Sequence, residues 1–179
     1  VGPGGSGSGY DHALIADAVT ASLSGDTIKI DAGTYYETID TAGKAIELVA
    51  PGGLGSVIVD GGGAQPLVIC TSGEGSATTF RDLVLQNGAH NNGGAIRIGG
   101  SSPSFVGCLI QDNHATDNGG GACAVGGGPR AVIDCSVGGC PPNELDRASP
   151  GAPNELLREN EPPGCEPDEP AVARLPSDS

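Results

Sequence analysis

Short runs of alternating apolar and polar residues recur through the first 140 residues of this 179-residue chain. Alternation at every second position places one face of a run inward and the other outward, as in half-buried β-strands. The clearest runs span residues 27–30, 45–49, 57–59 and 67–70, and turns rich in glycine follow them. Each run is too short to be stable alone, so the pattern predicts strands that stack around a shared core.

A longer repeat indicates how these strands stack. The segment from Phe80 to Gln86 returns at residues 105–111, and the segment from Asn92 to Ile98 returns at residues 118–125. A third copy begins at Val132, and the copies are offset by 25 to 27 residues. A fixed period of this size is typical of a solenoid, so we predict roughly four stacked coils over residues 25–140.

Aligning the copies predicts columns in which equivalent residues of successive coils lie over one another. The expected inward columns are Leu83–Cys108–Cys135, Leu85–Ile110–Val137, Ile96–Cys123 and Ile98–Val125, and one outward column is Val84–Leu109–Ser136. Asn92 and Asn118 share a turn position, where stacked side-chain amides can bond along the solenoid axis. Together with Cys108 and Cys135 they form the predicted structural ladder.

Residues 1–24 are predicted to be a leader followed by a capping helix. Residues 11–23 carry apolar side chains at helical spacing, namely Leu14, Ile15, Ala18, Val19 and Leu23. Asp11 can cap the N-terminus of this helix, and Ser24-Gly25 ends it. The open end of a solenoid exposes apolar core and unpaired strand edges, and an amphipathic helix can cover them.

Residues 141–179 lack the strand pattern. The stretch from Cys140 onward holds nine of the 14 prolines but only two of the 32 glycines, and acidic residues predominate in it. This composition predicts a disordered tail, and a truncated or frame-shifted gene end is an alternative. Either way the solenoid has no evident C-terminal cap, so end-to-end self-association is an expectation.

Charge and composition exclude several classes of protein. The formal net charge of −14 argues against nucleic-acid binding, because no basic stripe is present to neutralise phosphates. No apolar run is long enough for a transmembrane helix. The six cysteines form no CxxC pair, which argues against a zinc site. The sequence begins at Val1 without a signal peptide, as expected for a mature or excised part of an extracellular or cell-surface protein.

The motifs resemble the right-handed parallel β-helix proteins of the pectin lyase-like fold. The stretch Gly25-Asp26-Thr27-Ile28, followed by Gly33-Thr34-Tyr35-Tyr36 and Gly43-Lys44-Ala45-Ile46, is similar to the start of many bacterial members. Gly93-Gly94-Ala95-Ile96 is similar to repeats of polymorphic outer-membrane and related surface proteins. The resemblance covers residues 1–140 and implies an all-β, right-handed parallel β-helix. The same fold hosts lyases, hydrolases, esterases, adhesins and passive surface proteins.

Candidate chemistry is sparse. The resemblance to polysaccharide lyases implies stacked outward Asp, Arg and Lys, but Arg97 is expected to face Ala124 in the next coil, and no column carries two stacked charges. Asp112 and Asp117 flank one loop and are candidate calcium ligands, with turn capping and a catalytic pair as alternatives. No other cofactor is expected. His90 and His114 lie in equivalent loops about one residue out of register, which favours solvated side chains over metal ligands.

The remaining aromatic and thiol groups give few further leads. Phe80 and Phe105 are expected to face inward, which leaves only Tyr10, Tyr35 and Tyr36, all near the cap. Three tyrosines are a thin platform for a sugar, so the aromatic residues give the carbohydrate interpretation little support. Cys108 and Cys135 are expected to be buried free thiols, and Cys140 could pair with Cys165.

Two hypotheses of function follow from this pattern. The first is an exported or cell-surface repeat module with a non-catalytic role in adhesion, display or binding of polysaccharide or cell-surface glycan. The second is a fragment of a polysaccharide lyase or glycoside hydrolase of the pectin lyase-like fold, with part of its active site in coils outside this sequence.

Overall fold

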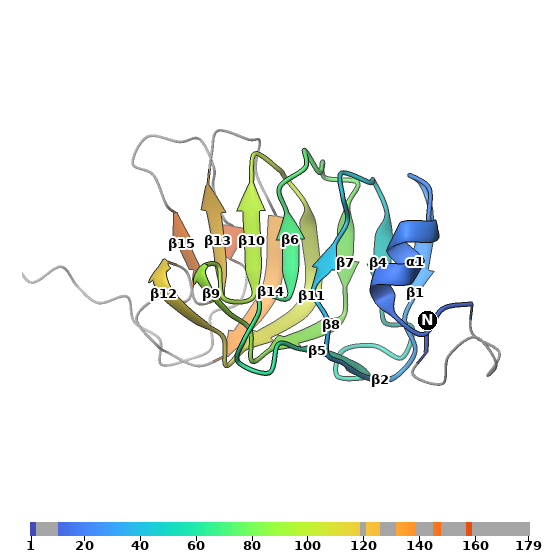
Figure 1. The fold of residues 1–179 in the computed structure, drawn as a ribbon, viewed down its shortest axis with the longest axis horizontal. Coiled ribbons are helices and arrows are strands. Elements are labelled where there is room, and N and C mark those ends of the chain that lie inside the picture. Colours follow the sequence, from blue (N-terminus) through green and yellow to red (C-terminus); the bar gives the residue numbers. More distant parts are fainter. Residues whose placement is uncertain (3–10, 119–120, 126–131, 139–144, 148–156, 159–179) are drawn as a thin grey trace, which may run out of the picture.

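The computed structural model describes residues 1–2, 11–118, 121–125, 132–138, 145–147 and 157–158, and of residues 117–118 and those after 122 only the backbone. Its strands pair in parallel throughout these residues and stack as a β-solenoid with one short helix (Figure 1). The mostly β, parallel solenoid predicted from the repeat is therefore confirmed.

The first two coils contain the strands that the alternating runs predict, and they add strands at the turns. The first coil holds β1 (Thr27–Lys29), β2 (Gly33–Tyr35) and β3 (Ile39–Asp40). The second coil holds β4 (Glu47–Val49), β5 (Val57–Asp60) and β6 (Val68–Cys70). Each strand of the second coil pairs with its counterpart in the first.

The repeated segments form the next two coils. The third holds β7 (Thr79–Arg81), β8 (Leu83–Gln86), β9 (Ala89–Asn92) and β10 (Ile96–Gly99). The fourth holds β11 (Ser104–Gln111), β12 (His114–Asn118) and β13 (Ala122–Val125). The long β11 pairs with β7 through its first half and with β8 through its second half, so it joins two rows of strands into one sheet.

Three further strands continue the stack. β14 (Val132–Gly138) pairs with β11, β15 (Leu145–Arg147) with β13, and β16 (Leu157–Arg158) with β14. Two of these short strands fall within residues 141–179, for which we expected a disordered tail. The rest of that segment, including Cys165, lies outside the described residues, as does Cys140.

The register of the strands confirms most of the predicted columns. Ile110 pairs with Leu85 on one side and Val137 on the other, and Cys108 pairs with Cys135. The other inward columns were predicted one residue out of register. Ile96 pairs with Ala122 and Ile98 with Ala124, so the offset stays at 26 from Asn92 onward. The predicted pairs Ile96–Cys123 and Ile98–Val125 imply an offset of 27, one residue more than the coil contains.

The helix α1 (Ile15–Ala21) covers the N-terminal end of the solenoid, but it is shorter than predicted (Figure 1). Ile15, Ala18 and Val19 are buried in the same core cluster as the strands, whereas Leu23 is 74% exposed. Asp11 is not the cap. The N-cap residue is Leu14, which makes no side-chain capping bond, and the Glu37 carboxylate accepts hydrogen bonds from the amides of Ile15 and Ala16 instead.

The buried Glu74 carboxylate connects three successive coils through hydrogen bonds. The Glu74 carboxylate is 1% exposed and accepts hydrogen bonds from the Gly43 and Ser72 amides and from the Thr41 and Ser101 hydroxyls. Burial raises the pKa of Glu74, but these hydrogen bonds outweigh it and leave the pKa below its usual value. Burial and the nearby Glu74 charge raise the pKa of the Cys70 thiol.

Within the described residues, no helix combines the length and the apolar composition needed to cross a bilayer.

Candidate functional site

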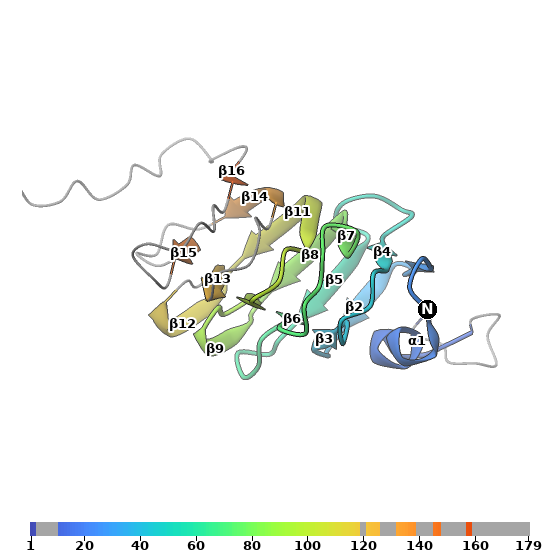
Figure 2. The same ribbon diagram turned by 90° about the horizontal axis from the view of Figure 1, so that it is seen from above.

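Strands β2, β5, β8 and the second half of β11 lie side by side in one row of the solenoid, and the outer face of this row is the candidate site (Figure 2). Val59, Leu85 and Ile110 of this row belong to the buried core. Because side chains alternate across a strand, the residues on either side of these three face outward. The parallel register then stacks the outward residues into two columns that run side by side along the solenoid axis.

The first column is an apolar stripe of Ile58, Val84 and Leu109. Ile58 pairs with Val84, and Val84 pairs with Leu109. Val84 is only 5% exposed, yet it is absent from the core cluster that contains both of its neighbours along β8. It is therefore covered from outside by the residues flanking it, while Ile58 and Leu109 are half-buried. The outward column Val84–Leu109–Ser136 predicted from the repeat is confirmed in register.

The second column is a polar ladder of Asp60, Gln86 and Gln111, one from each of three successive coils. Gln111 Nε2 donates to Gln86 Oε1 at 3.0 Å, and Gln86 Nε2 donates to Asp60 Oδ2 at 2.9 Å. The two carboxamides thus point their donors the same way along the axis, toward the carboxylate. Hydrogen bonds in such a chain polarise one another, so the ladder is a rigid, directional array.

Asp60 anchors the ladder as a carboxylate. It is 8% exposed, and besides Gln86 it accepts hydrogen bonds from the Gly62 amide at 2.9 Å and from Asn87 Nδ2 at 2.8 Å. The Gln86 and Gly62 donors hold the pKa of Asp60 below its usual value, against the opposing effect of burial. Asp60 is therefore ionised at neutral pH and accepts three hydrogen bonds from its neighbours.

A depression of about 410 Å³ adjoins the ladder where the chain leaves these strands. It is lined by Gly62, Gly63, Asn87, Gly88, Ala89, Asp112 and His114. Asn87 and Asp112 hold equivalent places one residue after Gln86 and Gln111, and both have a φ of 54°. Asn and Asp adopt this left-handed conformation more readily than other side chains, which explains their presence at the bend.

The floor of the depression is tied to the core. The buried Asn113 side chain accepts a hydrogen bond from the Gly88 amide at 2.7 Å and donates one to the Leu85 carbonyl at 3.0 Å. One coil earlier, Gly61 is also closely packed, because a Cβ atom there would lie 2.6 Å from the Asn87 carbonyl oxygen. The bend is thus packed at backbone contact, and the outer surface beside it is held in one conformation.

The predicted calcium ligands are only partly placed. Asp112 is exposed at the depression, whereas Asp117 lies in β12 and only its backbone is described. No group of three or more His, Cys, Asp or Glu side chains within the described residues could hold a metal ion. The calcium site remains a prediction, and the φ of 54° at Asp112 agrees with the alternative of a turn-forming residue.

The asparagines of the predicted structural ladder do not lie in a turn, and bonding of their side-chain amides along the axis stays a prediction. Asn92 pairs with Asn118 between β9 and β12, so both are strand residues, and the asparagine with positive φ is Asn87. Cys108 is buried. His114 pairs with Ala89 rather than with His90, which confirms that the two histidines are one residue out of register.

Arg97 lies on a different face, and its predicted neighbour is wrong. It is exposed on β10 and pairs with Cys123 on one side and Ile69 on the other, because the offset between the coils is 26 residues and not 27. Charged residues do meet elsewhere. Arg81 Nε lies 3.2 Å from Glu47 Oε1 on the outer face of β4 and β7, whereas the sequence predicted no column with two stacked charges.

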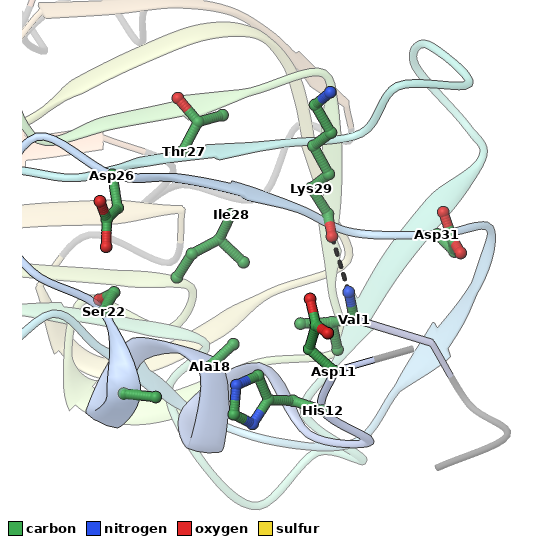
Figure 3. Close-up of a pocket in the computed structure, with 11 residues that line it drawn as sticks. Val1, Asp11, His12, Ala18, Ser22, Asp26, Thr27, Ile28, Lys29 and Asp31 are labelled. Carbon is green, nitrogen blue, oxygen red and sulfur yellow. Dashed lines mark hydrogen bonds between the residues drawn. The ribbon is translucent and has the colours of Figure 1, made fainter. Parts of the chain in front are cut away.

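A second pocket, of about 490 Å³, lies between α1 and β1 (Figure 3). Its lining includes Ala18 and Ile28 from the contact between the cap and the first coil, with Asp26 and Asp31 toward its two ends. The only hydrogen bond drawn across it joins the Val1 amino group to the Lys29 carbonyl, at 2.8 Å. We assign this pocket to the junction of cap and solenoid.

Sequence reasoning missed the polar ladder, although a signal for it exists. Gln86 and Gln111 close the two copies of the repeat, and Asp60 closes the run that precedes them by one coil. A pattern of charged residues does not reveal this column, because it consists of one carboxylate and two carboxamides.

No protein-family model matches this chain, and neither a curated protein nor a solved structure matches it.

Proposed function

We propose that this chain is a non-catalytic, exported or cell-surface β-solenoid module that binds polysaccharide along the outer surface of β2, β5, β8 and β11. The proposal rests on one observation, which is that two columns of outward side chains lie side by side. The apolar stripe of Ile58, Val84 and Leu109 runs directly beside the polar ladder headed by Asp60.

The chemistry of the two columns matches that of a sugar chain. A sugar ring offers C–H groups on its faces and hydroxyl groups at its edge, which fit an aliphatic stripe and a carboxamide ladder respectively. Neighbouring strands lie about 4.8 Å apart, so an extended polymer meets the same pair of columns again in each coil. The ladder is already hydrogen-bonded, so little side-chain freedom is lost on binding.

The state of Asp60 supports binding over hydrolysis. A glycosidase needs a protonated carboxyl as general acid and a second carboxylate at a defined distance. Asp60 is buried, accepts three hydrogen bonds and has a lowered pKa, so it is poorly suited to donate a proton. The alternative, a fragment of a lyase or hydrolase, rests on the resemblance of the Gly93-Gly94-Ala95-Ile96 repeat and the N-terminal motifs to the pectin lyase-like family.

The first experiment is co-sedimentation of the full chain with insoluble cellulose, chitin, mannan and cross-linked pectin, with calcium or with chelator, while new chain ends are assayed. We expect binding to at least one polymer without new ends. The variant Gln111→Leu should weaken binding, and the matched variant Arg97→Leu, on another face, should not. Retained binding by Gln111→Leu would move the site elsewhere, and released chain ends would favour the enzyme fragment.

A further inference from the structure

We infer that the polysaccharide is uncharged and lies along the coil axis with one sugar stacked on the Tyr36 ring. This inference rests on the proposed function and names the class of its ligand and a further binding residue.

Tyr36 continues the polar ladder into the first coil. Tyr35 pairs with Val59 between β2 and β5, and continuing this register by one residue places Tyr36 beside Asp60. Thr34 extends the apolar stripe in the same way, because it pairs with Ile58. The outer surface therefore spans four successive coils, from Tyr36 and Thr34 to Gln111 and Leu109.

The two adjacent tyrosines have opposite environments. The Tyr35 ring is 4% exposed, and its hydroxyl donates to the Asp31 carbonyl at 2.9 Å, so it serves the fold. The Tyr36 side chain is 73% exposed, although exposing so large an apolar group costs solvation free energy. An exposed aromatic ring offers a flat apolar face with a polar tip, which suits the C–H face of a sugar.

The charge of the surface selects among polysaccharides. Neither Lys nor Arg occurs in β2, β5 and β8 or in the second half of β11. The described acidic groups along this surface include Asp60, Asp112 and Asp82, which directly precedes β8, and the whole chain carries a formal charge of −14. An anionic polymer would meet like charge with no counter-charge, which costs affinity and slows encounter.

A cationic polymer is disfavoured by a separate argument. Asp60 already accepts three hydrogen bonds and is 8% exposed, so an ammonium group has little access to it. Asp112 is the exposed carboxylate, and an exposed ion pair contributes little net free energy. The basic residues nearest in the sheet, Lys29 and Arg81, lie on β1 and β7, in the other row of strands. The surface is thus built for neutral hydroxyl and C–H groups.

The test uses the full chain and soluble hexasaccharides of equal length: a neutral β-1,4-glucan, polygalacturonate and chitosan. Dissociation constants are measured by calorimetry at low and at moderate salt. We expect the neutral probe to bind most tightly with little dependence on salt. The variant Tyr36→Ala should weaken that binding by about two- to tenfold. Tyr36→Phe should retain it, and the exposed-site control Leu54→Ala should leave it unchanged.

The outcomes separate this inference from the proposed function. Tighter binding of polygalacturonate or chitosan that is lost in Gln111→Leu would overturn the uncharged class and leave the polysaccharide surface standing. An unchanged constant in Tyr36→Ala, with loss in Gln111→Leu, would overturn the role of Tyr36. Failure of all three probes, and of the insoluble polymers, would overturn both.

Discussion

The Phe80 and Phe105 rings stack in successive coils, with centroids 4.6 Å apart and planes within 7° of parallel. Both side chains are fully buried, and the two residues are register partners between β7 and β11. The separation of the rings is close to the spacing of about 4.8 Å between neighbouring strands. The coil repeat thus sets the stacking of the rings, and the same inward column continues through Leu48 to Ile28.

Replacing one of these rings should destabilise the solenoid strongly. We expect Phe105→Ala to lower the free energy of unfolding by about 3–5 kcal/mol, because it leaves a cavity against Phe80. Urea unfolding followed by far-UV circular dichroism measures the change. The control is Leu54→Ala, whose side chain is 51% exposed and which should change stability by less than about 0.5 kcal/mol. Equal effects of the two substitutions would contradict the inward placement of Phe105.

The bend below the ladder should not tolerate a side chain at Gly61. A Cβ atom there would lie 2.6 Å from the Asn87 carbonyl oxygen and 2.7 Å from that of Gln65. We expect Gly61→Ala to cost about 1–3 kcal/mol through overpacking. The matched control is Gly75→Ala, because no atom lies within 4 Å of the added methyl group. Thermal melts of both variants decide the point, and a Gly61→Ala melt like that of the wild type would argue against this close packing.

The cap is held at both ends by charged side chains of the first coil. Lys44 Nζ donates to the carbonyls of Val19, Thr20 and Ser22 at 2.5, 2.9 and 2.9 Å, at the end where a helix carries partial negative charge. We expect Lys44→Met to cost about 1–3 kcal/mol, since it removes a charged donor from three carbonyl groups. Hydrogen exchange should quicken at α1 amides. Lys29→Met, at an exposed side chain, is the control and should leave exchange at α1 unchanged.

The stability of the fold should decrease at acidic pH, because Glu74 becomes protonated. The folded protein holds the pKa of this carboxyl below its ordinary value of 4.5, so the ionised form stabilises the fold. That contribution is complete above about pH 4.5 and is lost as the pH falls through the folded-state pKa. Asp60 acts in the same direction from its ordinary value of 3.8. Urea titrations at pH 7, 5, 4 and 3 should therefore show stability declining below pH 5.

Two variants test whether Glu74 is the carboxyl group that causes this pH dependence. Glu74→Gln should lose about 1–3 kcal/mol at pH 7, because the amide group introduces donors beside the Ser72 and Gly43 amides. Its stability should then change less between pH 5 and pH 3. Glu47→Gln affects a partly exposed ion pair and should shift stability by less than about 1 kcal/mol. An acid profile of Glu74→Gln parallel to that of the wild type would rule out Glu74 as the main titrating group.

The sequence predicted the parts of this fold that depend on the repeat. The period places Leu85 with Ile110 and Cys108 with Cys135, because coils of nearly constant length put equivalent residues in register. The register failed at Ile96, where a small residue, Ala122, takes the inward place of a large one. Similarity of residue type there favours an offset of 27, whereas the offset of 26 between Asn92 and Asn118 predicts the observed pairing.

Local sequence patterns did not predict the contacts between segments that are distant in the chain. Asp11 has the right residue type for a cap, but Glu37, more than 20 residues later, supplies the carboxylate at α1. The short strands β2 and β3 lack alternation and are formed by pairing with the next coil. The binding surface needed the same information, because Asp60, Gln86 and Gln111 become one ladder only after the coils are stacked.

The most direct test of the central claim is to map a bound neutral glycan on the full, isotope-labelled chain by amide chemical-shift changes. The account predicts the largest changes at Tyr36, Asp60, Gln86 and Gln111, with side-chain amide signals of the two glutamines among them. Arg97 and its neighbours on β10 should stay unchanged. Changes centred on β10, or on the pocket between α1 and β1, would contradict the assignment of the binding surface.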